Sequence, residues 1–148
     1  MLYCHYINRR RIMEFTQKLR DQDLKVTPQR LALLEEIEHA GHIDIDALYE
    51  ILKMSFSSIS LATVYKNVNQ MYELKILEVI KVPDRKIQYE IAKEPHIHLA
   101  CNACGSVMDM NQCIDELMLS AESSSGYQLN HSTVVLNGLC PNCQAKSA

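Results

Sequence analysis

Apolar residues recur at helical spacing through the first half of the chain and predict a run of helices. Residues 13–23 alternate apolar and charged side chains. A second helix is expected after Thr27, whose hydroxyl can cap it, and Gly41 is placed to end that helix. A third helix should begin at Asp44 or Asp46.

The fourth expected helix, residues 60–73, has two chemically different faces. Lys66 points away from the apolar arc, and Thr63 and Tyr65 flank it. Such a polar face suits contacts with phosphates and base edges, although a solvated surface is the simpler alternative. At about 100° per residue, the apolar arc consists of Leu61, Val64, Val68 and Met71.

Two short strands, residues 77–82 and 87–91, are predicted next, and the polar turn between them carries Arg85 and Lys86. Several helices followed by a hairpin with a basic tip are typical of the winged helix. This helix-turn-helix variant places its second helix in the major groove of DNA.

The pattern changes after Lys93, where short strands and one helix are expected. The predicted fold class is α+β, with an N-terminal winged helix-turn-helix domain and a small C-terminal α/β dimerisation domain. The expected domains are residues 13–92 and 93–148, preceded by an extension at 1–12 that need not be native if Met13 is the start. The expected C-terminal elements are strands at 96–100, 106–110, 127–131 and 132–139, and a helix at 113–123 with Ile114, Leu117 and Met118 inward.

Composition and charge place the chain among soluble globular proteins. Of its 148 residues, 47% are hydrophobic, and no window approaches the roughly 20 apolar residues of a membrane span. The start of the chain lacks the features of a secretory signal, so a cytoplasmic location without a membrane partner is expected. Residues 1–30 carry seven Lys and Arg against three acids, whereas residues 94–148 carry one lysine against five acids. This asymmetry favours a DNA-binding front half joined to a sensing or assembly module.

Two C-x-x-C pairs with 35 residues between them predict a closed structural zinc site formed by Cys101, Cys104, Cys140 and Cys143. Disulfides are the alternative, and the cytoplasmic expectation disfavours them. Cys4 and Cys113 are expected to be ordinary thiols. His96 and His98 lie two apart on a predicted strand, which puts both imidazoles on one face and suggests ligands for another metal ion.

Four blocks of sequence together resemble the ferric uptake regulator (Fur) superfamily. Their order and spacing match from about residue 14 to 143. The resemblance implies a homodimeric, metal-dependent repressor bound to a palindromic DNA operator, and not an enzyme. It adds Lys25 as a minor-groove reader to Thr63, Tyr65 and Lys66. The blocks are Val26–Arg30, Ser60–Asn67, the His-x-His-x-x-C-x-x-C-G run at His96–Gly105, and Cys140–Cys143.

The resemblance also implies a regulatory metal site with ligands from both domains. Three imidazoles and two carboxylates suit Fe(II), Mn(II) or Zn(II) better than a soft thiolate metal. A bound ion is expected to fix the angle between the domains and so the spacing of the recognition helices. The implied ligands are His42, Glu90, His96, His98 and Asp109.

Within the superfamily, the chain is most similar to the peroxide-responsive repressor (PerR) branch, because Pro95 and Ile97 interrupt the longer histidine run of iron-sensing members. In that branch, Fe(II) reacts with hydrogen peroxide and ligating histidines gain oxygen. His42 and His96 are the matching histidines. Glu90, where aspartate is typical of that branch, favours the alternative of an iron-responsive regulator without peroxide sensing.

Lys66, where the peroxide-responsive branch can carry asparagine, points to the iron-responsive alternative as well. A zinc-uptake regulator ranks third, because no cysteine is positioned to join the regulatory site. His131 lacks the partners of a further metal site, and a hydrogen-bonding or surface role is expected for it.

Two enzyme classes are the alternatives outside DNA binding. A catalytic metal centre would use the His, Glu and Asp cluster with an open coordination position, but no substrate pocket is evident from the sequence. A thiol oxidoreductase would use one C-x-x-C pair at a helix start, whereas this chain has two distant pairs.

Overall fold

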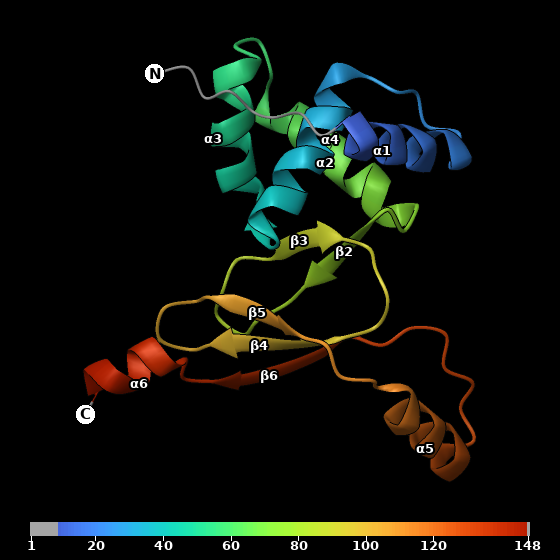
Figure 1. Ribbon diagram of the computed structural model, residues 1–148, viewed down its shortest axis with the longest axis vertical. Helices are drawn as coiled ribbons and strands as arrows, with labels where there is room; N and C mark the ends of the chain where they lie inside the picture. The colour runs from blue at the N-terminus through green and yellow to red at the C-terminus, as the bar shows by residue number, and fades with distance from the viewer. Residues whose placement is uncertain (1–8, 148) are drawn as a thin grey trace. The chain divides into compact units, whose positions relative to one another are not determined.

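The computed structural model describes residues 9–147 and divides them into two compact units. The first unit comprises the described residues up to Val79 together with Gln88–Ala92. The second comprises Ile80–Ile87 and the chain from Lys93 onward. The α+β class predicted from the sequence is confirmed, since the described part contains helices and two three-stranded sheets (Figure 1).

Helices dominate the first unit, and side chains close to each helix start account for where most of them begin. Thr27 accepts a hydrogen bond from the amide of Arg30, Asp44 from that of Ala47, and Ser60 from that of Thr63. Gly41 ends the second helix with φ of +74°, a conformation that glycine adopts at no steric cost. The described helices here are α1 (Arg9–Asp21), α2 (Pro28–Ala40), α3 (Ile45–Ser55) and α4 (Leu61–Glu73).

The N-terminal helix differs from its prediction. Residues 9–12, expected to lie in an extension, are helical, and α1 ends at Asp21 two residues earlier than expected. Salt bridges from Arg11 to Glu14 and Glu38 involve this first turn, which apolar periodicity alone did not reveal. Residues 1–8, including Cys4, lie outside the described residues.

The core of the first unit lies between the four helices. On α4, Val64, Val68 and Met71 are fully buried, as their periodicity predicted. Leu61 is 36% exposed, so its assignment to the core was wrong, because the first residue of the helix lies at the edge of the packed region. Other buried members of this core are Phe15, Leu19, Leu33, Leu34, Ile37, Leu48 and Leu52.

A small sheet with strand order β1-β3-β2 belongs to the first unit, except for Ile80 at the end of β2. Its strands are β1 (Ile43–Asp44), β3 (Gln88–Ile91) and β2 (Leu77–Ile80). The hairpin strands β2 and β3 were predicted, although both are shorter than expected. Strand β1 was missed because two residues carry no periodic signal.

The second unit is built on a sheet in which β4 (Ile97–Cys101) is the central strand. It pairs antiparallel with β5 (Val107–Met110) and parallel with β6 (Val134–Gly138). Two helices accompany the sheet, α5 (Asp115–Ser125) and α6 (Pro141–Ser147). Its buried core is small and includes Ile80, Val82 and Ala100, with Val107 and Val135 packed against them.

Several C-terminal predictions were wrong. Helix α5 leaves Leu117 59% exposed, although Ile114, just before it, is buried. A unit of this size has little core in which to place every apolar side chain. Residues 127–131 form no strand, and the second cysteine pair opens helix α6. Nowhere in residues 9–147 is a helix both long and apolar enough to span a membrane.

Candidate metal centres and DNA-binding helix

The four predicted zinc ligands form one cluster in the second unit. Their sulfur atoms all lie within 4.8 Å of one another, and Sγ of Cys104 is 3.9 Å from Sγ of Cys140. Four thiolates at about 2.3 Å from a tetrahedral zinc ion lie about 3.8 Å apart, so the cluster fits such an ion.

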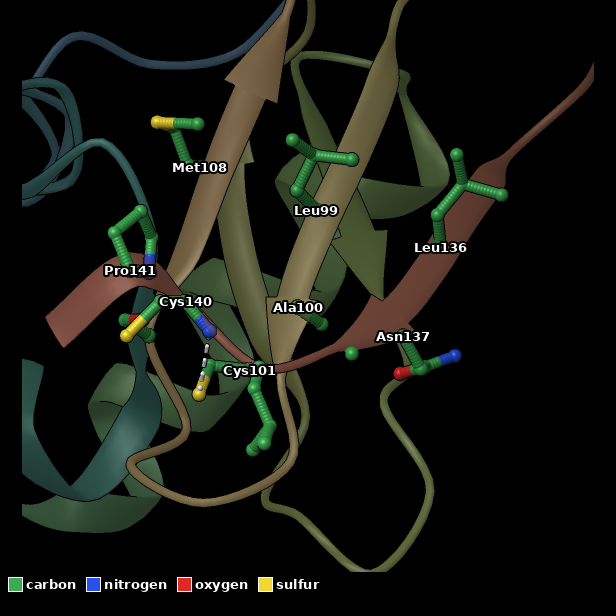
Figure 2. A pocket seen from close by; sticks show the side chains of 11 residues that line it. Leu99, Ala100, Cys101, Met108, Leu136, Asn137, Cys140 and Pro141 are labelled. Carbon is green, nitrogen blue, oxygen red and sulfur yellow. Dashed lines mark hydrogen bonds between the residues drawn. The ribbon is translucent and has the colours of Figure 1, made fainter. Parts of the chain in front are cut away.

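Backbone pairing accounts for how residues so distant in sequence meet. The parallel register of β4 and β6 puts Cys101 opposite Gly138, and the amide of Asn102 donates to the carbonyl of Gly138 at 2.8 Å. The amide of Cys140 then donates to Sγ of Cys101 at 3.4 Å, as the dashed line in Figure 2 shows. Gly105, with φ of +76°, closes the first cysteine loop.

The protonation of this cluster depends on the sulfur atoms' immediate neighbours. Hydrogen bonds from the backbone of Cys104 and then Cys140 lower the pKa of Cys101 to about 6. The Ser106 hydroxyl, with its Oγ 3.2 Å from Sγ of Cys104, lowers the pKa of that thiol. The thiols of Cys140 and Cys104 raise the pKa of Cys143 to about 12. Four adjacent thiolates repel one another, and a divalent cation removes this obstacle because coordinated thiols are deprotonated.

A second group of candidate ligands lies on strands β4 and β5 and immediately before β4. The antiparallel register places His98 directly opposite Asp109. Oδ1 of Asp109 is 3.7 Å from Nε2 of His98 and 3.3 Å from Nε2 of His96. Both histidines are buried, and their ring centroids are 4.4 Å apart. Three of the five predicted regulatory ligands therefore come together within the second unit.

The orientation of His96 is suited to metal binding through Nε2. Its Nδ1 lies 2.9 Å from the carbonyl oxygen of Glu94. Because a carbonyl only accepts, Nδ1 must carry the proton, and in the neutral ring the lone pair is left on Nε2. This arrangement, in which a backbone carbonyl fixes the tautomer, is common for histidines that bind metals.

The first unit holds the other two predicted ligands. Nε2 of His42 lies 3.6 Å from Oε2 of Glu90, whose side chain is 1% exposed. Strands β1 and β3 are antiparallel, and Ile43 pairs with Tyr89. Their neighbours His42 and Glu90 therefore lie opposite each other. An imidazole nitrogen and a carboxylate oxygen are both ligands that divalent cations such as Fe(II) and Mn(II) take in proteins, so this pair fits a cation-binding role.

The predicted DNA-contacting residues lie in the first unit. On α4, Lys66 is exposed and Tyr65 is 44% exposed, whereas Thr63 is half-buried, with its hydroxyl 2.8 Å from that of Ser60. Lys25, before α2, is exposed. These positions leave the lysine and tyrosine side chains accessible to a partner.

Sequence reasoning missed the role of Arg30. Its Nε donates to Oδ1 of Asn67 at 3.0 Å and its Nη2 to Oε1 of Gln70 at 2.7 Å. Its Nη1 donates to the backbone carbonyl of Lys25 at 2.7 Å. Arg30 therefore ties two predicted DNA-contacting segments together, which its position in the Val26–Arg30 block alone did not indicate.

Two other residues singled out in the sequence have local partners. Sγ of Cys113 donates to Oδ2 of Asp115 at 3.2 Å. Nε2 of His131 lies 3.3 Å from the hydroxyl of Thr133, which agrees with the hydrogen-bonding role expected for this histidine.

Comparison with known proteins identifies relatives across most of the chain. The family model described as the ferric uptake regulator family matches residues 21–137. Among curated proteins, the peroxide-responsive repressor PerR of Staphylococcus saprophyticus is 29% identical over 130 residues, covering 86% of this chain and 88% of that protein.

Solved structures of two kinds of regulator are similar as well. The Campylobacter jejuni peroxide stress regulator is 37% identical with a TM-score of 0.72, covering 88% of this chain and 100% of that one. The Vibrio cholerae ferric uptake regulator is 31% identical with a TM-score of 0.71, covering 84% of this chain and 98% of that one.

Proposed function

Because the chain belongs to the ferric uptake regulator family, we propose that it is a metal-dependent DNA-binding transcriptional repressor that responds to peroxide. It binds a palindromic operator as a homodimer. Iron-catalysed oxidation of histidines in the regulatory site ends repression. The domains at 13–92 and 93–148 carry DNA binding and dimerisation, respectively.

The support for DNA binding is the exposed face of α4. Lys66 and Tyr65 are accessible there, while the opposite face is buried in the core. A helix held in this way can enter the major groove with its polar face toward the bases. Thr63 contacts a phosphate, and Lys25 reads the minor groove beside it.

The support for a homodimer is an apolar face on the second sheet. The register places Leu99 opposite both Met108 and Leu136, so their side chains lie on one face of the sheet (Figure 2). Met108 is 61% exposed and Leu136 is 50% exposed, beside a hollow of about 430 Å³. An apolar surface of this kind suits burial against a second copy.

The structural metal in this proposal is zinc, held by the four cysteine thiolates. The regulatory ion, Fe(II) or Mn(II), uses both groups of buried nitrogen and oxygen donors. The proposed ligands of the regulatory ion are His42, Glu90, His96, His98 and Asp109. Since these residues come from two units, binding favours the conformation competent for DNA and raises its population.

The peroxide response rests on the chemistry of the regulatory donors. A bound Fe(II) ion would supply the electrons that split hydrogen peroxide. The imidazole rings of His42 and His96 have carbon atoms that can take up an oxygen atom. An oxidised ring no longer has the geometry of a metal ligand. The observation that carries this proposal is the trio of buried His96, buried His98 and partly buried Asp109, which has nitrogen and oxygen donors and no thiol. The 37% identity with the C. jejuni peroxide stress regulator adds support.

Peptide mass spectrometry tests the proposal. Zinc-containing protein is loaded with Fe(II) without oxygen and exposed to a slight molar excess of hydrogen peroxide. One added oxygen on the peptides containing His42 or His96 is expected, together with loss of operator binding. Protein loaded with Mn(II) is the control and should stay unmodified.

An iron-responsive regulator without peroxide sensing is the second candidate. The longer arm of Glu90 and the presence of Lys66 favour it, as does the 31% identity with the V. cholerae ferric uptake regulator. Unmodified histidines in the same experiment, with metal-dependent DNA binding retained, would select this function.

A further inference from the structure

The two carboxylate oxygens of Asp109 face different partners. Oδ1 lies toward the imidazoles, 3.3 Å from Nε2 of His96 and 3.7 Å from Nε2 of His98. Oδ2 pairs instead with the ammonium group of Lys93, a residue that the sequence did not single out as part of the site. Two imidazoles that can bind a metal ion and one ammonium group that is itself a cation thus meet at one carboxylate.

We propose that Lys93 is a positioning residue that keeps Asp109 a one-oxygen ligand of the regulatory metal ion and weakens the binding of that ion. The inference rests on the proposed regulatory site. With Oδ2 held by the ammonium group, Oδ1 is the oxygen presented on the side of the two Nε2 atoms. A carboxylate otherwise binds a metal through one or both oxygens.

The hydrogen bond from Lys93 has a consequence for coordination number. Hydrogen-bonding groups behind a ligating carboxylate orient it and tune its donation to the metal. A carboxylate restricted to one oxygen occupies one coordination position where a chelating carboxylate occupies two. Lys93 would therefore leave a bound ion with one more position that a small molecule such as peroxide could occupy.

The charge of Lys93 acts in a second way. The side chains of Lys93 and Asp109 are 44% and 28% exposed, so water screens their interaction only in part. An ammonium group paired with the carboxylate that faces both imidazoles repels an arriving divalent cation. Removing the charge while leaving the methylene stem should raise affinity for Mn(II) by about tenfold at low salt.

Three variants separate the charge of Lys93 from its hydrogen bond. Lys93→Met removes both, and Lys93→Gln removes the charge but keeps an N–H donor. Lys81→Met removes one exposed lysine elsewhere in the same unit and controls for net charge. Zinc content and dimer mass, measured by native mass spectrometry, confirm that each variant is folded.

The measurements are Mn(II) affinity by calorimetry and the visible spectrum after Co(II) loading of zinc-containing protein. Six-coordinate Co(II) absorbs more weakly than five-coordinate Co(II). We expect tighter Mn(II) binding in both Lys93 variants, and a weaker Co(II) band in Lys93→Met alone. In an Asp109→Asn background, Lys93→Met should leave the Co(II) band unchanged, because the effect acts through that carboxylate.

Unchanged or weaker Mn(II) binding in folded Lys93→Met, or a Co(II) band equal to that of the wild type, would overturn the inference. Failure of the proposed function gives a different result. In that case the wild-type protein binds no metal ion other than the structural zinc, and His98→Ala changes neither the Mn(II) titration nor the Co(II) spectrum.

Discussion

Arg30 on α2 donates a hydrogen bond from Nε to Oδ1 of Asn67 on α4, across 37 positions of sequence and a distance of 3.0 Å. Asn67 in turn donates from Nδ2 to the backbone carbonyl of Thr63 at 3.0 Å. The guanidinium of Arg30 is therefore occupied in holding the helix that presents Tyr65 and Lys66. We therefore expect Arg30 to influence DNA binding through the position of this helix and not only through charge.

Replacement of Arg30 should accordingly affect both stability and DNA binding. For Arg30→Ala, we expect a loss of about 1–2 kcal/mol in the free energy of unfolding. The substitution removes three hydrogen bonds that the partly exposed guanidinium donates. Operator affinity should fall by more than the lost charge explains. Denaturant unfolding and fluorescence anisotropy measure the two effects. Arg20→Ala, an exposed charge on α1, is the matched control and should leave stability unchanged. Equal effects of the two variants would remove the proposed role of Arg30.

Lys66→Ala is expected to weaken operator binding without affecting the metal sites. If Lys66 neutralises a phosphate, the slope of the logarithm of affinity against that of salt concentration falls by about 0.9. Anisotropy titrations at several salt concentrations measure the slope, and elemental analysis should find the zinc content intact. Lys53→Ala, on the exposed side of α3, is the comparison. Wild-type affinity and slope in Lys66→Ala would exclude a contact with DNA.

Cys101→Ser should remove zinc and lower the fraction of the protein that is dimeric. The second unit has a small core, so metal binding contributes directly to its folding. A loss of about 3 kcal/mol lowers the melting temperature by roughly 10 °C in a chain of this length. Calorimetry, zinc analysis and light scattering measure these effects. Cys113→Ser lies outside the sulfur cluster and should keep both zinc and dimer. A stable, zinc-free dimer of Cys101→Ser would contradict the structural role of the metal.

Gly105→Ala should destabilise the first cysteine loop for two separable reasons. The residue has φ of +76°, which costs an alanine roughly 1 kcal/mol or more. Its Cβ would also lie 3.1 Å from Nη1 of Arg85, whose Nη2 donates to the carbonyls of Asn102 and Ala103. Chemical denaturation of Gly105→Ala, Arg85→Ala and the double variant measures the coupling between them. In the Arg85→Ala background the cost of Gly105→Ala should shrink but not vanish. Strict additivity would show that no contact exists.

The sequence by itself determined the features that depend on neighbouring residues. The start of α2 at Thr27 and of α4 at Ser60 follows from hydrogen bonds to amides three residues away. The buried face of α4 follows from helical periodicity, with Leu61 as the exception at its end. Each C-x-x-C pair is likewise local, because a short turn is enough to bring its two sulfur atoms together.

Tertiary structure decided the features that depend on distant partners. The parallel pairing of β4 and β6 brings the two cysteine pairs into one cluster, and the register of β4 and β5 puts Asp109 beside His98. The hydrogen bonds of Arg30 with Asn67 and of Lys93 with Asp109 join residues 37 and 16 positions apart, respectively. The two C-x-x-C pairs predicted that the four cysteines share one site, but no local pattern encodes the strand pairing or these hydrogen bonds. Such contacts exist only after the chain has closed the intervening loops and packed its elements.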